Sequence, residues 1–75
     1  MPKGVFTQAE QQLLWIMNDH VRGVEPGGFY TALIEAALKA DEDNLRLLGL
    51  GFPDVEAAVR GWRASPDGWG IGGVD

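Results

Sequence analysis

The chain has 75 residues, a formal net charge of −5 from 6 Lys and Arg against 11 Asp and Glu, and no cysteine. This length allows one small domain with a marginal core, and a hydrophobic content of 45% excludes a disordered tail. The lack of cysteine excludes a disulfide scaffold and thiolate metal sites, and it suits a reducing cytoplasm. Direct binding to nucleic acid is not expected from the acidic balance. We expect no membrane span, because the apolar runs are short, and no secretory signal, because polar glutamines follow soon after residues 1–4.

The first predicted helix covers residues 7–22. Thr7 and Glu10 have the spacing of a capping box, in which each side chain accepts a hydrogen bond from the other residue's backbone N–H. Apolar side chains then recur with the helical period, and His20 falls on this apolar face, which favours a packed core histidine. Gly23 is expected to end the helix in the left-handed conformation.

One aromatic residue of this segment breaks the pattern. Trp15 lies in the middle of an otherwise polar arc that includes Gln11, Gln12 and Asn18. Aromatic anchors supply much of the energy of protein interfaces, so Trp15 is a candidate contact with a partner. The alternative is that a loop or the tail of the same chain covers it.

The second predicted helix covers residues 28–40 and follows a connector in which Gly27 and Gly28 allow a tight reversal. Its side chains are apolar around most of the circumference, which is typical of a helix at the centre of a fold. Glu35 and Lys39 form a favourable i,i+4 pair of minor energetic weight. Because three short helices cannot easily cover so much apolar surface, we expect the chain to form a homo-oligomer.

Two further helices and a glycine-rich tail complete the chain. A helix over residues 42–49 is predicted to begin after Asp41 as N-cap and to end at glycines, and a helix over residues 53–64 is predicted to begin with a proline. The last helix carries a one-sided apolar stripe formed by Val55, Ala58, Val59 and Trp62. In the tail, residues 65–75, apolar anchors indicate a segment that lies along a surface, with Trp69 covering the core. The predicted fold is an all-α single domain, a compact bundle of three to four short helices with a Gly-rich C-terminal tail.

Three elements between Val24 and Trp62 form a recognisable pattern: the run Pro26-Gly27-Gly28-Phe29-Tyr30-Thr31-Ala32-Leu33-Ile34, the turn Ala40-Asp41 with Asn44, and Gly51-Phe52-Pro53 before a Val-rich helix. The pattern spans about half of the chain and resembles small accessory proteins of tailed bacteriophages and prophages. That group has no assigned catalytic or binding residues to carry over. The resemblance implies location in the cytoplasm of a bacterial host. It also implies a protein that occupies or inhibits a host component, such as a defence or regulatory factor.

The residue types give little support to catalysis or metal binding. His20 is the only histidine and Ser65 the only serine, so neither a hydrolytic triad nor a zinc site is expected. The acidic run Asp41-Glu42-Asp43 is interpreted as a solvated helix cap, because leucines follow where a calcium loop needs oxygen ligands. We therefore predict a non-catalytic protein that uses no cofactor and no metal.

Two binding hypotheses remain open. In the first, a host protein docks through exposed aromatic residues with an acidic rim, and the candidate contacts are Trp15, Tyr30, Trp62 and Trp69. In the second, a small anionic ligand such as a nucleotide signal binds at the helix start after the connector, and the candidate ligands are Arg22, Gly27, Gly28, Phe29, Arg60 and Arg63. The net charge of −5 favours the first. A virion or packaging accessory is a further alternative.

Overall fold

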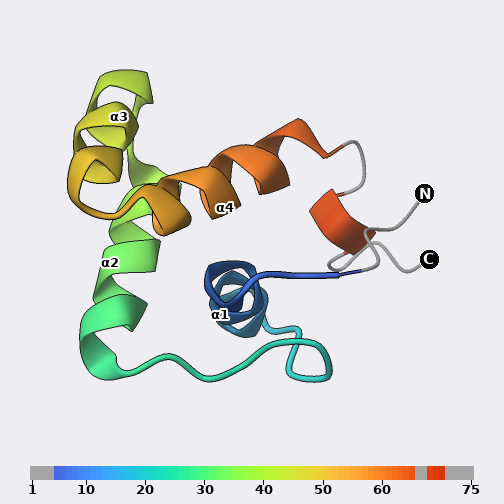
Figure 1. The fold of residues 1–75 in the computed structure, drawn as a ribbon. Coiled ribbons are helices and arrows are strands. Elements are labelled where there is room, and N and C mark those ends of the chain that lie inside the picture. Colours follow the sequence, from blue (N-terminus) through green and yellow to red (C-terminus); the bar gives the residue numbers. More distant parts are fainter. Residues whose placement is uncertain (1–4, 66–67, 71–75) are drawn as a thin grey trace.

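The computed structural model describes residues 5–65 and 68–70, and this part of the chain contains helices and no strand (Figure 1). The elements in chain order are α1 (Gln8–Ile16), α2 (Gly28–Lys39), α3 (Glu42–Gly51), α4 (Pro53–Ala64) and a short 3₁₀ turn, η1 (Gly68–Gly70). The predicted all-α helical bundle is confirmed. Among the described residues, none of the helices combines the length and the apolar content that crossing a membrane requires. The predictions for residues 66–67 and 71–75 of the tail lie outside the described residues.

Helix α4 is the centre of the bundle. It contacts α1, α2, α3 and η1, and in Figure 1 it runs from α2 and α3 at one end to η1 at the other. Of its predicted stripe, Val55, Ala58 and Val59 are buried, whereas Trp62 is partly buried and packs against the core. The prediction that α2 is the central helix is wrong, because α2 buries only Ile34 and Ala37. One side of α2 packs on the bundle, and the described residues contain no further helix to cover its other side.

The core takes side chains from every α-helix. The largest fully buried side chains are Leu13, Leu14, Ile34, Leu45 and Val59. Burial of one such aliphatic side chain stabilises a fold by about 1.5–3 kcal/mol, so the small core depends on each helix. Trp69 of η1 is only 5% exposed and belongs to this core. The prediction that Trp69 covers the core is therefore confirmed.

The end of α1 differs from the prediction, which extended the helix to Arg22. The helix stops at Ile16, and Asn18 adopts a left-handed conformation with a φ of 71°. The Asp19 carboxylate then accepts hydrogen bonds from the backbone N and from Nε of Arg22, at 3.1 and 2.7 Å. Asn tolerates the left-handed region, and Asp offers the backbone an alternative to helical bonding, so this pair turns the chain early. His20 consequently leaves the helix and is exposed, so the predicted core position is wrong.

Gly23 has a different role from the predicted left-handed cap, because its φ is not positive. A Cβ atom at this position would collide with the carbonyl oxygen of Asp19 and with the backbone N of Trp15. The next residue, Val24, donates its backbone N–H to the Gln11 carbonyl at 3.0 Å. Gly23 thus allows the loop after α1 to fold back closely against the helix.

The predicted starts of α1, α3 and α4 are confirmed in detail. The Glu10 carboxylate accepts from Thr7 N at 2.8 Å and the Thr7 hydroxyl accepts from Glu10 N at 3.2 Å, which completes the capping box of α1. The Asp41 side chain accepts from Asn44 N at 2.8 Å at the start of α3. Pro53 opens α4 at its first position. These signals are local in the sequence, which explains why the sequence pattern predicts them well.

Helix α3 continues to Gly51, two residues beyond the predicted end at Gly49. Gly49 is buried inside the helix, where a Cβ atom would collide with the side chain of Glu56 on α4. The missing side chain therefore serves the close packing of α3 on α4 and does not terminate the helix.

Candidate protein-binding surface

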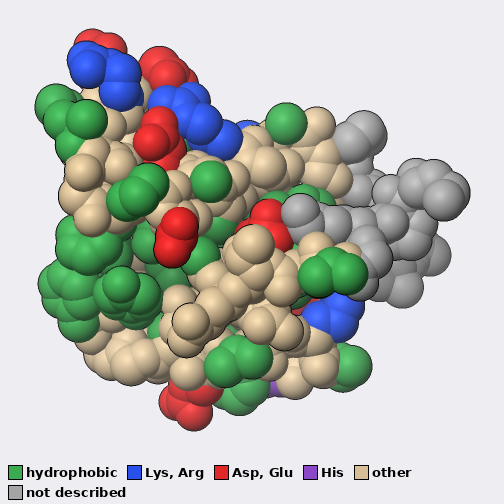
Figure 2. All heavy atoms as spheres, viewed as in Figure 1, with side chains coloured by type: hydrophobic (Ala, Val, Ile, Leu, Met, Phe, Trp, Pro, Cys, Tyr) green, Lys and Arg blue, Asp and Glu red, His purple; other side chains and the backbone are tan. Residues whose placement is uncertain are grey.

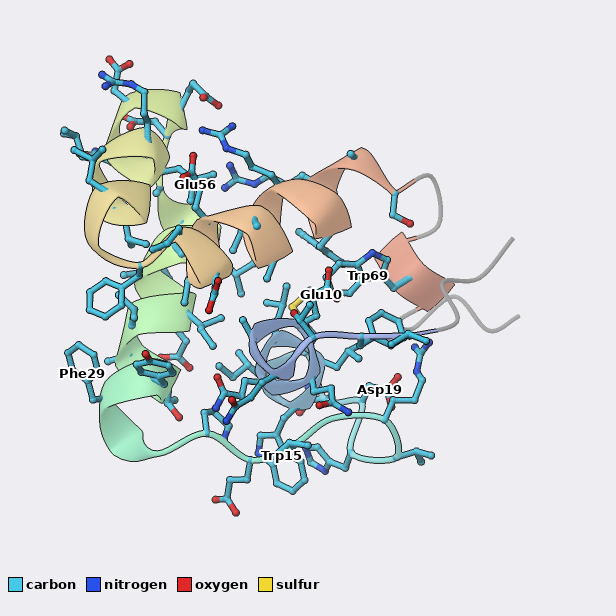
Figure 3. The ribbon with its side chains drawn as sticks, viewed as in Figure 1. Glu10, Trp15, Asp19, Phe29, Glu56 and Trp69 are labelled. Carbon is cyan, nitrogen blue, oxygen red and sulfur yellow. The ribbon has the colours of Figure 1, made fainter. Side chains whose placement is uncertain are left out.

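Three aromatic rings meet at the start of α2. Phe29 and Tyr30 belong to the first turn of this helix, and Phe52 joins α3 to α4. The ring centroids are 5.6 Å apart for Phe29 and Tyr30, 5.8 Å for Phe29 and Phe52, and 6.1 Å for Tyr30 and Phe52. Phe29 is nevertheless 64% exposed, and Figure 3 shows it projecting outward from α2. We call these three residues the aromatic patch.

Exposed leucines add apolar surface on α3. Leu47 and Leu50 are both exposed on this helix, and Figure 2 shows hydrophobic side chains at α2 and at α3 along one edge of the molecule, with other atoms between them. An exposed apolar surface of this kind is typical of a binding site, because leaving it in contact with water is unfavourable.

A surface pocket of about 220 Å³ opens beside the aromatic patch. It lies where α1 meets the starts of α2 and α4, and it shares Tyr30 and Phe52 with the patch. The other lining residues are Gln8, Ala9, Gln12, Asp54 and Val55. Pockets for drug-sized ligands occupy roughly 300–1,000 Å³. This smaller pocket suits a single side chain or a small polar group.

Two polar groups of the pocket stand out: an unpartnered acceptor on Gln12 and the carboxylate of Asp54. Gln12 is only 7% exposed, and its Oε1 is buried with no hydrogen-bond donor among the described residues. A buried acceptor in this state costs about 1–3 kcal/mol. Asp54 adds a carboxylate that makes no ion pair with any described residue, and no lysine or arginine lines the pocket. The pocket therefore carries negative charge from Asp54, and the Gln12 oxygen beside it is buried and has no donor among the described residues.

The arginine side chains of α4 are bound to other groups of the chain. Arg60 donates two hydrogen bonds to the Glu42 carboxylate, at 3.0 and 2.7 Å, and Nε donates to Glu56 at 2.7 Å. These bonds lower the pKa of Glu42 from its usual value and raise the pKa of Arg60. These bonds join α3 to α4, and they occupy the Arg60 guanidinium with two carboxylates of the same chain.

The predicted anion site is not assembled within one chain. Arg63 donates to two carbonyl oxygens near the C-terminal end of α2, at 3.1 and 3.0 Å. Gly27 and Gly28 lie at the other end of this 12-residue helix, about 18 Å away at 1.5 Å per residue. Arg22 is bound to Asp19. The N-cap of α2 is Gly27, one residue before the expected Gly28, and it provides no side-chain hydrogen bond. Among the described residues, each of the three candidate arginines is bound to another group of the chain.

The predicted aromatic contacts have mixed outcomes. Trp15 is half-buried and stacks on His20, with ring centroids 4.0 Å apart, so the loop of the same chain covers it (Figure 3). Trp69 is buried and Trp62 packs beside the core, so neither offers a large exposed surface. Tyr30 is exposed and belongs to the aromatic patch.

Most residues that line the pocket were not predicted as site residues, among them Gln12, Phe52 and Asp54. A helical wheel places Gln12 on the solvent arc, because the wheel does not show that the starts of α2 and α4 lie beside that side of α1. The i,i+4 spacing of Gln8 and Gln12 was the available signal, since it places both amides on one face of α1.

The described residues contain no group of three or more His, Asp or Glu side chains placed to hold a metal ion. Comparison of the chain with protein-family models, with curated proteins and with solved structures finds no match. The aromatic patch and its pocket are therefore the features of the chain that bear on its function.

Proposed function

We propose that this protein is a non-catalytic binding module of bacteriophage type that occupies a protein of the bacterial host through the aromatic patch. The observation that carries the proposal is the 64% exposure of Phe29 beside two other aromatic rings. Burial of such a side chain is worth about 1.5–3 kcal/mol, and aromatic residues dominate the energetics of interfaces. The sequence resemblance to bacteriophage accessory proteins supplies the choice of a host partner.

Charge favours a basic partner over a second copy of the chain. Two copies would each bring a net charge of −5, and the acidic residues Glu25 and Asp54 are exposed close in sequence to the patch residues. Opposite charge steers a basic protein toward such a surface and repels a like-charged one. Self-association stays a prediction, and the experiment below separates it from binding of a host protein.

Photo-crosslinking in bacterial cells tests the proposal. A photoreactive phenylalanine analogue replaces Phe29 in one variant and Val21, which is 95% exposed but outside the patch, in the matched control. We expect a host protein to crosslink at position 29 and not at position 21. The purified partner should then bind at least about tenfold more weakly to F29A than to V21A, because truncation of an aromatic anchor costs more than 1 kcal/mol.

Two results would contradict the proposal. Equal crosslinking at both positions would show that the patch is not a specific contact. A crosslinked species of twice 8.1 kDa as the sole product would assign the patch to a homo-oligomer instead.

A further inference from the structure

We propose that the pocket beside the aromatic patch binds the guanidinium group of an arginine side chain on the partner protein. This inference rests on the proposed function and deepens it, because it names the chemistry of the residue that the partner presents. It starts from Gln12, a side chain more than nine-tenths buried whose carbonyl oxygen lacks a donor.

The lining of the pocket matches the donors and the charge of guanidinium. Asp54 supplies a carboxylate, and the carboxamides of Gln8 and Gln12 supply neutral acceptor oxygens. The observed Gln12 Oε1 is buried, so it reaches the pocket only after a turn about the terminal torsion of the side chain, whose energy profile is broad. Guanidinium carries five N–H donors in a planar fork and stays charged at all physiological pH values.

The aromatic walls select a flat cation. Tyr30 and Phe52 line the pocket with their rings nearly perpendicular, at 89°. A guanidinium within about 6 Å of an aromatic face gains cation–π attraction, and it is more weakly hydrated than an ammonium, so it loses less on entering the pocket. A volume of about 220 Å³ fits one such side chain and its methylene stem.

A titration followed by NMR tests this inference without knowledge of the partner. The probe is N-acetyl-arginine methylamide, added to the ¹⁵N-labelled full chain. We expect saturable shifts of the Gln12 side-chain amide and of the backbone amides of Tyr30 and Asp54. The citrulline analogue has nearly the same shape but no charge, and we expect it to bind at least about tenfold more weakly, as expected for loss of a charge-assisted contact. The lysine analogue should bind more weakly than the arginine probe.

Matched variants connect the shifts to the pocket. D54N should weaken binding of the arginine probe at least about fivefold, whereas D43N, which removes one exposed acid from the first turn of α3, should leave it unchanged. Q12L tests the buried acceptor, with chemical-shift dispersion as the check of folding, and we expect about fivefold weaker binding. If the citrulline analogue binds as well as the arginine probe, or if D54N and D43N behave alike, the inference is wrong.

Two separate readouts, the probe titration and the crosslinking, keep the two proposals distinguishable. Val21 lies outside both the patch and the pocket, so V21A should bind the arginine probe normally. Probe binding without any crosslinked partner would contradict the proposed function alone. A crosslinked partner without probe binding would contradict the arginine pocket alone.

Discussion

Asp19 shows how a single side chain ends a helix before its hydrophobic pattern ends. Its carboxylate holds the backbone N–H of Arg22 at 3.1 Å and the Nε of the same residue at 2.7 Å. These bonds, the backbone one foremost, lower the pKa of Asp19 from its ordinary value of 3.8. Removing the charge with D19N is expected to reduce the free energy of unfolding at pH 7 by about 1 kcal/mol, since a charge-assisted bond is lost at a partly exposed site.

The pH dependence of this effect follows from the sign of the pKa shift. A carboxylate with a lowered pKa stabilises the folded state fully above its unfolded pKa, and the stabilisation is lost as the pH falls through the folded pKa. The difference between wild type and D19N should therefore shrink as the pH falls below about 4. Urea unfolding at pH 7, 5 and 3 measures it, with D43N as the control for removal of an exposed acid. A difference that is constant over this range would contradict the assigned role of Asp19.

At the scale of elements, two glycines predict opposite responses to alanine. In G23A the new methyl group would meet backbone atoms of Trp15 and Asp19, which cannot rotate away, so we expect a loss of about 1–3 kcal/mol. Gly61 lies inside α4, where a Cβ would be 3.4 Å from the Trp69 ring, an ordinary contact. G61A should therefore be neutral or stabilising by up to about 1 kcal/mol through helix propensity. Thermal unfolding followed by circular dichroism separates the two, and equal melting temperatures would contradict the close approach at Gly23.

The same elements show what the sequence could predict. The starts of α3 and α4 depend on a cap or a proline next to the helix, so local spacing was sufficient. The end of α1 depends on a left-handed Asn18 and on a loop that returns to the helix, and hydrophobic periodicity contains neither. The aromatic patch depends on which helix becomes central. The sequence predicts α2 at the centre of the bundle, but α4 lies there. The apolar first turn of α2, with Phe29, is therefore exposed at the surface.

At the scale of the whole molecule, segments from both ends of the chain meet on α1 and α4. Phe6 packs edge-on against Trp69, with ring centroids 5.3 Å apart, and the backbone N–H of Trp69 donates to the Ser65 hydroxyl at 3.1 Å. The turn η1 contacts the end of α4 that lies away from the aromatic patch (Figure 1). The aromatic residues Phe6 and Trp69 thus stabilise one end of the bundle, and the aromatic patch proposed for binding lies at the other end.

Two aromatic-to-alanine substitutions test this separation. W69A removes a buried ring and should cost about 3–5 kcal/mol, which is comparable to the whole stability of a domain of this size, so we expect loss of the cooperative melting transition. W69F keeps an aromatic ring in place and should remain folded. F29A removes an exposed ring and should change the free energy of unfolding by less than about 0.5 kcal/mol. Circular dichroism and chemical unfolding measure all three variants. If F29A unfolds the chain as W69A does, the aromatic patch is part of the core and the docking proposal loses its basis.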